Sequence, residues 1–374
     1  MIDKKADVLV IGGGIIGCSG AFFLAKNGKE VILLERNTSV GLEASGVNAG
    51  SLPVQSKPFP MTHLALAAAE LWQTFSREVG YELDYHRVGG LRVAETEEDL
   101  TKLRDIAKNQ RRYGLFVEEI SGENARKIAP YLGESIRGAN YCELDGYADP
   151  LKVVRLVARA AIDWGVKIMT EISVLEISPK LRSGYLVKTT KGVFEAGQVL
   201  IAAGVWSRQI TKSLGVDLPI SLRINQMMVT DQSPPLLHHL ITHANGNLTL
   251  KQLPVGTIMV GGGWQGKGDL ITNTKEPTYE SMIGNADMAI RVVPALRKIL
   301  VIRSWAAFDG RTADKIPIIG DVSGNPGAYL ATACFGGFQI GPLVGRLIAE
   351  KICTGASSIP IDEFNVSRYD QEKK

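Results

Sequence analysis

The chain has 374 residues, which is long for one domain and sufficient for two modules with substantial cores. Apolar residues make up 45% and charged residues 22%, as in ordinary globular proteins, and the net charge of +3 comes without a basic run, which argues against nucleic acid or an anionic membrane surface as a partner. Four scattered cysteines without a CxxC pair argue against a disulfide framework or a cysteine zinc site, and they predict reduced thiols in a cytoplasmic protein.

A strand and a glycine-rich turn open the chain over residues 7–17. Val8–Ile11 has the composition of a strand buried on both faces, and it leads into the spacing Gly12-x-Gly14-x-x-Gly17. The first glycine of this spacing permits a tight turn and the second lets the backbone approach a pyrophosphate. The third lets the following helix pack closely on the strand. The segment therefore predicts a dinucleotide-binding turn.

A helix and a second strand follow the glycines. We predict the helix over Ile15–Asn27, with Gly28 as its stop, and its N-terminus offers free N–H groups and a positive dipole end to phosphates. The buried strand Val31–Leu34 ends in Glu35, about 20 residues after the glycines, where a carboxylate binds the hydroxyls of the adenosine ribose. These features alone would also allow an NAD-dependent dehydrogenase.

The nearly uncharged stretch Val8–Ala25 has a second interpretation, as a signal peptide or a membrane span. A signal sequence would not carry the glycine spacing or the following strand with its acid. The stretch is also rich in glycine and barely long enough to cross a bilayer. We therefore expect neither a targeting segment nor a transmembrane segment.

A loop of small and polar residues over 36–51 follows the second strand, at the sheet edge where α/β proteins bind ligands. An acid and a basic residue close the strand, and the loop contains Ser-Gly-x-Asn-Ala-Gly. This combination resembles the FAD-dependent amino acid oxidase and dehydrogenase superfamily, which includes glycine oxidase, sarcosine oxidase and heteromeric dehydrogenase subunits. The resemblance implies that Ser45 and Asn48 contact the pyrophosphate and that Gly50 runs beside the isoalloxazine. A solvated Gly/Ser loop is the alternative on residue types alone.

The middle of the chain alternates between two predicted domains. Residues 64–79 have the apolar periodicity of a helix that packs on the core. A strand and a charged surface helix over 88–113, and a further strand at 141–143, resemble the start of the substrate domain of the family. The chain then returns to the flavin domain, where Asp149 is the predicted N-cap and Pro150 the first residue of a helix.

A second flavin segment follows the hairpin predicted over 166–195. A buried aliphatic strand meets a glycine and a short helix, and this resembles the family segment "A-A-G-x-W-S", which closes over the ADP half of FAD. The resemblance implies contacts from Ala203, Gly204 and Trp206, and it places Val174 where the backbone meets the adenine.

Two further motifs lie in the strand-rich region that is expected to roof the substrate. Gly261–Lys267 nearly spells a phosphate-binding P-loop, but Gly268 replaces the residue that would bind Mg²⁺ and no apolar helix follows. His238, His239 and His243 include an i, i+4 pair that could hold a metal on a helix. Because no carboxylate or cysteine stands near them in the sequence, we expect a surface histidine cluster and no metal site.

The last part of the chain resembles the family segment "W-A-G-x-x-x-x-T-x-D-x-x-P-x-I-G", beginning at Trp305. A strand, a glycine turn and a final helix ending near Cys353 follow it. In the family this turn lies against the pyrimidine edge of the isoalloxazine, where the helix N-terminus stabilises negative charge on the reduced flavin. Cys334 is the one residue near an attachment point, and we expect FAD to be held noncovalently.

Three departures separate this chain from glycine oxidase and its D-amino acid relatives. Asp309 stands where those relatives usually have an arginine that binds the substrate carboxylate, and Gly336 replaces a common histidine. The tyrosine often found on the strand Leu248–Gln252 is absent. That strand looks closer to the β-type subunits of heteromeric dehydrogenases, which act on D-hydroxyproline, proline or opines.

The residues that contact the substrate are less well defined than those of the flavin segments. Arg223, Asp309 and Arg311 are candidates for substrate binding, and the carboxylate anchor could be Arg223, Arg311 or Lys251. In relatives similar to sarcosine oxidase, a lysine on a comparable strand lies over the flavin and assists the reaction with oxygen. This likeness makes Lys251 a candidate catalytic residue, with a surface lysine at a strand end as the alternative.

We predict an α/β chain with a Rossmann-like FAD-binding domain and an interleaved α+β substrate domain built on an antiparallel sheet. The FAD-binding domain is expected over 1–80, 145–215 and 301–374, and the substrate-binding domain over 81–144 and 216–300. The cofactor-binding residues implied by the resemblance are Gly12, Gly14, Ile15, Ile16, Gly17, Glu35, Arg36, Ser45, Asn48, Ala49, Gly50, Ser51, Leu52, Val174, Ala203, Gly204, Trp206, Phe335, Gly336, Gly337, Phe338 and Gln339.

The resemblance implies oxidation of a small amino acid or secondary amine, with hydride transfer from its α-carbon to flavin N5 and an imine as product. Electrons would pass to an acceptor other than oxygen, either directly or through a partner subunit, and such an acceptor could bring the cytoplasmic protein to the inner membrane. One alternative is a glycine or D-amino acid oxidase that produces hydrogen peroxide. The other is a flavin-holding subunit without catalytic activity of its own.

Overall fold

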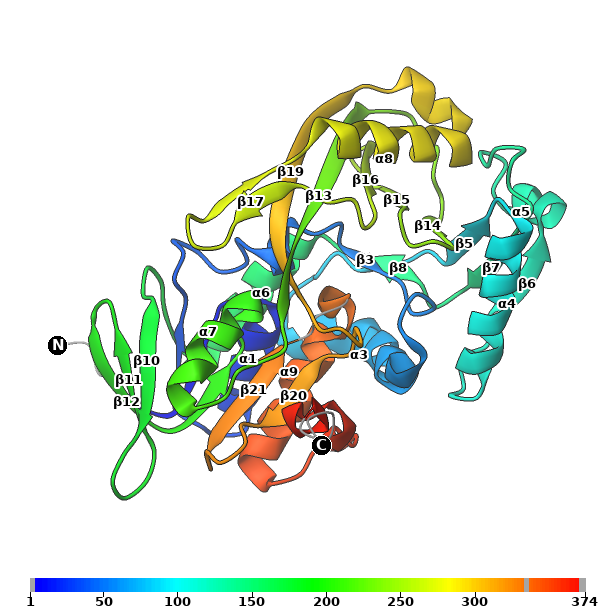
Figure 1. Cartoon of the computed structure of the whole chain (residues 1–374). Coiled ribbons are helices and arrows are strands. Elements are labelled where there is room, and N and C mark those ends of the chain that lie inside the picture. Colours follow the sequence, from blue (N-terminus) through cyan, green and yellow to red (C-terminus); the bar gives the residue numbers. More distant parts are fainter. Residues whose placement is uncertain (1–3, 333–335, 370–374) are drawn as a thin grey trace.

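The computed structural model describes residues 4–332 and 336–369 and contains two large β-sheets (Figure 1). In the first sheet the central strands and one edge strand pair parallel, and the remaining outer strands pair antiparallel. Across this sheet lie β10 (Val174–Pro179), β11 (Tyr185–Thr189), β12 (Gly192–Ile201), β1 (Lys5–Ile11), β2 (Val31–Leu34) and β9 (Lys167–Met169), with β21 (Ala328–Thr332) beside β12 and β20 (Ile318–Asp321) beside β21.

The central strands of the first sheet are buried on both faces, as predicted. On β1, Val8 and Val10 point into one apolar core while Leu9 and Ile11 point into another. This alternation follows from the two-residue period of a strand, and it explains why the run contains no polar residue. The helices that share the first of these cores are α1 (Ile15–Lys26), α3 (Thr62–Val79), α6 (Pro150–Asp163) and α9 (Gly337–Thr354).

The local signals for helix ends are confirmed. Helix α1 ends at Lys26, with Asn27 as its C-cap, and Gly28 leaves the helix with a φ of +79°. Asp149 is the N-cap of α6, and its carboxylate accepts a hydrogen bond from the N–H of Lys152 at 2.9 Å. These short-range rules hold because they involve neighbours in the chain.

The second sheet is mostly antiparallel, and only the pair β14–β5 is parallel among the described strands. Its order is β19 (Val301–Arg311), β13 (Ser221–Gln232), β16 (Thr257–Gly261), β15 (Thr249–Gln252), β14 (Leu240–His243), β5 (Gly90–Ala94), β7 (Gly138–Cys142) and β6 (Glu118–Ser121). Nearby helices are α4 (Glu97–Arg111), α5 (Gly122–Ile128) and α8 (Tyr279–Val292).

Strand β19 differs from the predicted domain division. The sequence predicts residues 301–374 in the FAD-binding domain, yet 301–311 pair along β13 in the second sheet. The reason is tertiary, because the partner strand lies about 80 residues earlier in the chain and local sequence does not record the pairing. The division into two domains is otherwise a prediction that follows the two sheets.

Smaller elements lie outside the two large sheets. The predicted loop over 36–51 contains a short helix and a two-residue strand, so it is more ordered than its small polar residues suggested. These smaller elements are α2 (Ala44–Val47), α7 (Ser207–Thr211), β3 (Ser51–Leu52), β4 (His86–Arg87), β8 (Gly146–Tyr147), β17 (Lys267–Asp269), β18 (Thr274–Glu276), and the 3₁₀ turns η1 (Phe59–Met61), η2 (Gly204–Trp206), η3 (Lys212–Leu214), η4 (Pro294–Lys298), η5 (Asp362–Phe364) and η6 (Val366–Tyr369).

The expected surface histidine cluster is wrong for His243. This residue lies on strand β14 rather than on a helix, and it is buried with 2% exposure. Its ring Nε2 lies 3.5 Å from a Glu95 oxygen and 3.9 Å from an Asp99 oxygen, two acids that the sequence places far away. His239 instead contacts the Tyr131 hydroxyl. Among the described residues, no group of histidines, cysteines and acids has a metal-binding arrangement.

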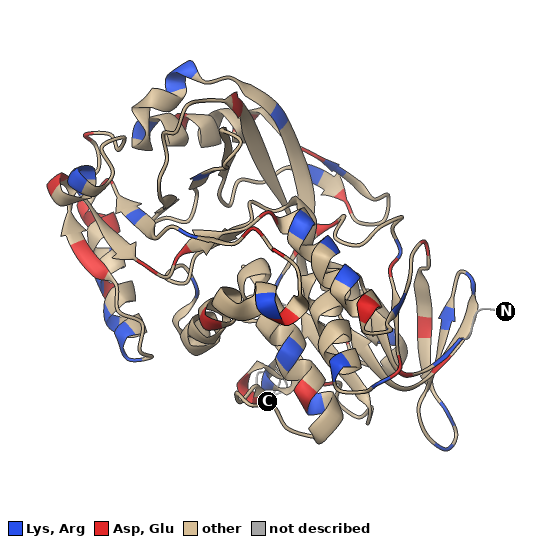
Figure 2. Cartoon of the chain, turned by 180° about the vertical axis from the view of Figure 1, so that it is seen from behind, with Lys and Arg blue, Asp and Glu red and all other residues tan. Residues whose placement is uncertain are grey.

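The sequence predicts neither a P-loop nor a membrane-spanning helix, and both expectations can be compared with the described residues. The P-loop-like string runs into strand β17 without an intervening helix. No helix in the described part of the chain combines the length and the apolar character that crossing a bilayer requires. Seen from behind, lysines and arginines are interspersed with acids over most of the elements (Figure 2).

Candidate functional site

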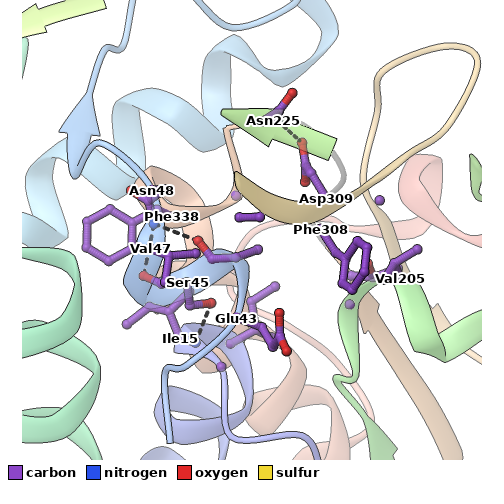
Figure 3. A pocket seen from close by; sticks show the side chains of 18 of the residues that line it. Ile15, Glu43, Ser45, Val47, Asn48, Val205, Asn225, Phe308, Asp309 and Phe338 are labelled. Carbon is purple, nitrogen blue, oxygen red and sulfur yellow. Dashed lines mark hydrogen bonds between the residues drawn. The ribbon is translucent and has the colours of Figure 1, made fainter. Parts of the chain in front are cut away.

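A cavity of about 630 Å³ lies between the two sheets. Its walls come from the turn after β1, the end of β2, the loop over 41–51, the turn after β12 and the first turn of α9. Strands β13 and β19 of the second sheet complete it. Side chains from these separate segments point into one space, with Ser45 and Phe338 on one side and Asp309 on another (Figure 3).

The glycine turn is shaped so that a ligand can approach the backbone. Gly12 has a φ of +108°, and a Cβ there would lie 2.5 Å from the Ala202 carbonyl oxygen. A Cβ on Gly14 would lie 2.9 Å from Ser45 Oγ. A Cβ on Gly17 would collide with the Gly12 carbonyl, so this third glycine serves the packing of α1 on the turn, as its place in the motif predicts.

Glu35 is fixed at the end of β2 by backbone hydrogen bonds. Its Oε2 accepts from the N–H of Gly13 at 2.7 Å and its Oε1 from the N–H of Asn37 at 2.8 Å. Each carboxylate oxygen retains a second lone pair, so the group can still accept hydroxyl hydrogens from a ligand. The buried carboxylate is therefore held beside the glycine turn and lines the cavity.

Ser45 and Asn48 both line the cavity, and their hydrogen bonds organise the loop. Ser45 Oγ accepts from the N–H of Ile15, at the first residue of α1, at 3.0 Å. Asn48 Nδ2 donates to the carbonyl oxygens of Ala44 and Ser45, and its Oδ1 accepts from the N–H of Gly50 at 2.6 Å (Figure 3). The loop is thus tied to the helix N-terminus, where a phosphate would lie.

The structure brings most of the predicted site residues to this one cavity. The predicted residues that line it are Gly12, Gly14, Ile15, Ile16, Glu35, Arg36, Ser45, Asn48, Ala49, Ser51, Val174, Ala203, Gly204, Trp206, Asp309, Arg311, Gly336, Gly337 and Phe338. Those that do not line it are Gly17, Gly50, Leu52, Arg223, Lys251 and Gln339. Phe335, like Cys334, lies outside the described residues.

Packing explains why some predicted residues do not reach the cavity. Leu52 belongs to the apolar core under the helices. Gln339 is buried on α9, where its Nε2 donates to the Ala65 carbonyl oxygen at 2.9 Å. Arg223 is the Cα partner of Asp309 across strands β13 and β19, but its side chain is not part of the lining.

Lys251 is buried rather than at the surface, so the alternative of a surface lysine is wrong. Its side chain is 2% exposed, its Nζ donates to the Ala148 carbonyl oxygen at 3.1 Å, and the ammonium lies 4.8 Å from the centre of the Tyr147 ring. Burial lowers the pKa of Lys251 to about 7. Its catalytic role stays a prediction, because the group does not line the cavity in this structure.

Asp309 forms a polar group on the wall of the second sheet. Its Oδ2 accepts a hydrogen bond from Asn225 Nδ2 at 2.9 Å (Figure 3). Arg311 Nε lies 3.7 Å from the same oxygen. Burial raises the pKa of Asp309 to about 6, against the neighbouring Arg311 cation and the Asn225 hydrogen bond, which favour the ionised form. This carboxylate is the acid that the second sheet presents to the cavity beside an amide.

Several residues of the cavity lining were missed from sequence, and three of them carry polar or charged side chains from outside the flavin segments. Lys57 is buried, and its Nζ donates to the Gly336 carbonyl oxygen at the N-terminus of α9 at 2.9 Å. Burial lowers its pKa to about 8. Arg92 and Thr242 line the same region from strands β5 and β14. Arg92 could have been found from its sequence, because it is the one charged residue of strand β5 and stands between the apolar residues Leu91 and Val93.

The residues present fit FAD. A glycine turn whose close packing leaves no space for a Cβ, the N-terminus of α1 and the fixed acid at the end of β2 together fit a pyrophosphate and a ribose. The cavity continues from there to the glycine turn before α9, so both halves of a dinucleotide can be accommodated.

Comparisons with known proteins agree with this geometry. Residues 7–351 match the family model of FAD dependent oxidoreductases (DAO). An opine oxidase subunit of Rhizobium meliloti is 26% identical over 99% of this chain and 99% of its own length. Glycine oxidase of Geobacillus kaustophilus is 26% identical over 98% of this chain and 97% of its own length.

Solved structures are similar over the whole chain. The structure of glycine oxidase from Geobacillus kaustophilus gives a TM-score of 0.91 at 25% identity and covers 98% of this chain and 99% of that one. L-proline dehydrogenase from P. horikoshii also gives 0.91, at 26% identity and 99% of each chain. The protein therefore belongs to the FAD dependent oxidoreductase family, uses FAD as its cofactor and oxidises CH–NH groups of amino acid or amine substrates.

Proposed function

We propose that this protein is a dehydrogenase for an amino acid or secondary amine of the D-amino acid, proline, hydroxyproline or opine type, and that its electrons pass to an acceptor other than oxygen. The observation that carries the proposal is the Asp309–Asn225 pair on the cavity wall. Glycine oxidase-like relatives are expected to present an arginine there. The names of an opine oxidase subunit and of L-proline dehydrogenase among similar proteins support the same substrate range.

The cofactor would be held by the residues of the first sheet. Gly12 and Gly14 leave room for the pyrophosphate at the N-terminus of α1, and Glu35 accepts hydrogen bonds from ribose hydroxyls. The remaining predicted lining residues, among them Val174 and Trp206, form the walls. When bound, FAD supplies the acceptor for the hydride that leaves the α-carbon of the substrate.

The second sheet would orient the substrate. The Asp309 carboxylate offers a hydrogen-bond acceptor to a bound ligand on this wall, and Asn225 holds that carboxylate in place. Arg311 favours the ionised form of Asp309, so the acceptor is present at neutral pH. The apolar residues of the same walls exclude water from the reacting carbon.

The experiment is an absorbance spectrum of the purified protein followed by anaerobic addition of D-hydroxyproline, D-proline, L-proline, glycine, D-alanine and an opine. Bleaching of the flavin band by one amine, with slow return in air, is the expected result. Fast return with formation of hydrogen peroxide would instead establish an oxidase. A flavin band that no amine bleaches would favour the non-catalytic subunit.

A partner subunit is part of the proposal. The opine oxidase and sarcosine oxidase relatives are each named as one subunit of an enzyme, and each matches 98% or more of this chain. The test is the mass of the native complex after gentle purification, together with the rate at which the reduced protein passes electrons to a dye. Slow turnover of the isolated chain with dye, restored by a co-purifying subunit, is the expected result.

A further inference from the structure

One part of the cavity wall is formed by the two adjacent parallel strands β5 and β14. Arg92 and Thr242 are Cα partners in this pair, so their side chains lie on the same face of the sheet. The preceding residues on the two strands, Leu91 and Ile241, lie in the apolar core on the other face. Arg92 and Thr242 accordingly face the cavity, and both line it.

The Arg92 guanidinium is only partly satisfied by the protein. Its Nη1 donates to the Gln55 carbonyl oxygen at 3.4 Å and its Nη2 to the Ala244 carbonyl oxygen at 3.2 Å, which are long bonds for a charged donor. Arg92 Nε, Thr242 Oγ1 and Ser56 Oγ have no hydrogen-bond partner among the described residues. A guanidinium carries five N–H donors, so several remain for a ligand.

The charges around this part of the wall are unbalanced. Lys57 lines the cavity close by, because it lies two residues after the Gln55 carbonyl that Arg92 contacts. Asp145 is the acid whose charge raises the pKa of both Arg92 and Lys57. In the described part of the chain, no ion pair within 4.0 Å joins Asp145 to either of these cations. Asp145 instead accepts hydrogen bonds from the backbone and side chain of Gln55. A bound anion would compensate this excess of positive charge.

We propose that Arg92, with the hydroxyl of Thr242, binds the carboxylate of the substrate and so selects amines that carry a free carboxylate. The proposal rests on the amine oxidation proposed above. A planar guanidinium pairs with a carboxylate through two parallel hydrogen bonds, and a hydroxyl on the neighbouring strand can donate a third. Asp309 cannot serve this purpose, since it is itself an anion and lies on strand β19 at the edge of the same sheet.

The test compares a carboxylate with its uncharged counterpart. The FAD-loaded protein is titrated with pyrrole-2-carboxylate and with pyrrole-2-carboxamide, and binding is followed by the flavin spectrum and by the thermal shift of the protein. Arg92→Gln should weaken the binding of pyrrole-2-carboxylate by about 10- to 100-fold, and it should change the affinity for the carboxamide by no more than about 3-fold. Arg92→Lys should recover part of the loss, because the charge returns without the planar fork.

The matched control is Arg182→Gln, which removes an exposed arginine from the turn between β10 and β11. This variant should bind both compounds as the unmodified protein does. The proposal is overturned if Arg92→Gln weakens the binding of both compounds equally, or the binding of neither. Release of FAD by this variant, or failure of the unmodified protein to bind pyrrole-2-carboxylate, would also overturn it. If no amine reduces the flavin but carboxylate binding still depends on Arg92, the carboxylate site stands and the proposed reaction fails.

Discussion

Arg36 lies over the indole of Trp206, with its guanidinium carbon 3.6 Å from the ring centre. This contact joins the residue that follows β2 to the turn that follows β12, and both residues line the cavity. Arg36 also pairs with Glu43, which in turn accepts a hydrogen bond from Lys275 of the β17–β18 hairpin. One wall of the FAD cavity is therefore held together by the ends of two strands of the first sheet, the loop over 41–51 and the separate β17–β18 hairpin.

The first prediction concerns the glycine cradle. Gly14→Val adds branched carbons at a position where even a Cβ would lie 2.9 Å from Ser45 Oγ, and it closes the approach of the pyrophosphate. The backbone of Gly14 has a φ of −79°, which valine can adopt, so we expect the fold to persist. FAD binding should weaken by at least about 100-fold, measured as flavin absorbance after gel filtration.

The control for this variant is Gly28→Ala in the same strand–helix–strand unit. Gly28 has a φ of +79° and nothing within 4 Å of a Cβ, so alanine adds only about 1 kcal/mol of backbone strain. This variant should retain FAD. Full retention of FAD by Gly14→Val would show that the phosphate turn lies elsewhere.

The second prediction concerns the ion pairs of Glu43. Its carboxylate lies 2.6 Å from Lys275 Nζ and 3.0 Å from Arg36 Nη2, and its side chain is 18% exposed. Glu43→Gln leaves two partly buried cations without their anion, so the free energy of unfolding should fall by about 1–2 kcal/mol. Urea unfolding of the two proteins at low salt measures the difference.

Glu195→Gln is the matched control for Glu43. Glu195 also lies between two lysines, Lys5 and Lys180, but at the surface. Solvent screens such a pair, so this variant should unfold at nearly the same urea concentration as the unmodified protein. Equal losses in both variants would contradict the role assigned to burial.

The third prediction concerns the pH dependence of stability. The pKa of Lys251 falls from its ordinary 10.5 to about 7 on burial, so between these values the unfolded chain binds a proton that the folded chain does not. Stability should therefore rise as pH rises from 7 to 10. Lys251→Met should be more stable than the unmodified protein at pH 7, by about 1–3 kcal/mol, and the advantage should shrink towards pH 10.

Urea unfolding at pH 7, 8, 9 and 10 tests this, with Lys212→Met as a control at an exposed lysine. Lys57, whose pKa is lowered to about 8, acts in the same direction and should keep part of the slope in the Lys251 variant. A pH profile unchanged by Lys251→Met would mean that the amine stays charged in the folded protein.

The fourth prediction concerns Asp309. Burial raises its pKa from 3.8 to about 6, so between these values the folded chain binds a proton that the unfolded chain does not. Stability from this group is therefore present at low pH and is lost as pH rises through 6. Asp309→Asn should remove this slope while keeping a hydrogen bond to Asn225, and it should gain about 1 kcal/mol at pH 7.

The same variant has a functional consequence. Protonation of Asp309 below about pH 6 removes the acceptor that this wall offers to a bound ligand, so the amine concentration that half-reduces the flavin should rise as pH falls through 6. Asp309→Asn should show weaker binding without that pH step. Asp321→Asn, at an exposed aspartate, should leave the profile unchanged. An unaltered pH step in Asp309→Asn would assign it to another group.

Features that depend on neighbours in the chain could be predicted from the amino-acid sequence. The Gly12, Gly14 and Gly17 spacing, the buried strand Val31–Leu34 and the N-cap at Asp149 all appear in the structure as predicted. Backbone conformation, helix capping and side-chain alternation are settled within a few residues, so they leave a readable pattern. The resemblance of the flavin segments to the family has the same origin.

Contacts between distant residues required the folded chain. Lys251 is buried against the Ala148 carbonyl, His243 lies on strand β14 beside Glu95, and Arg92 faces the cavity next to Thr242. The sequence places none of these partners together. Strand pairing and packing bring them into contact, and desolvation then sets their pKa values, so both the charges and the chemistry of the substrate half of the site are properties of the tertiary structure.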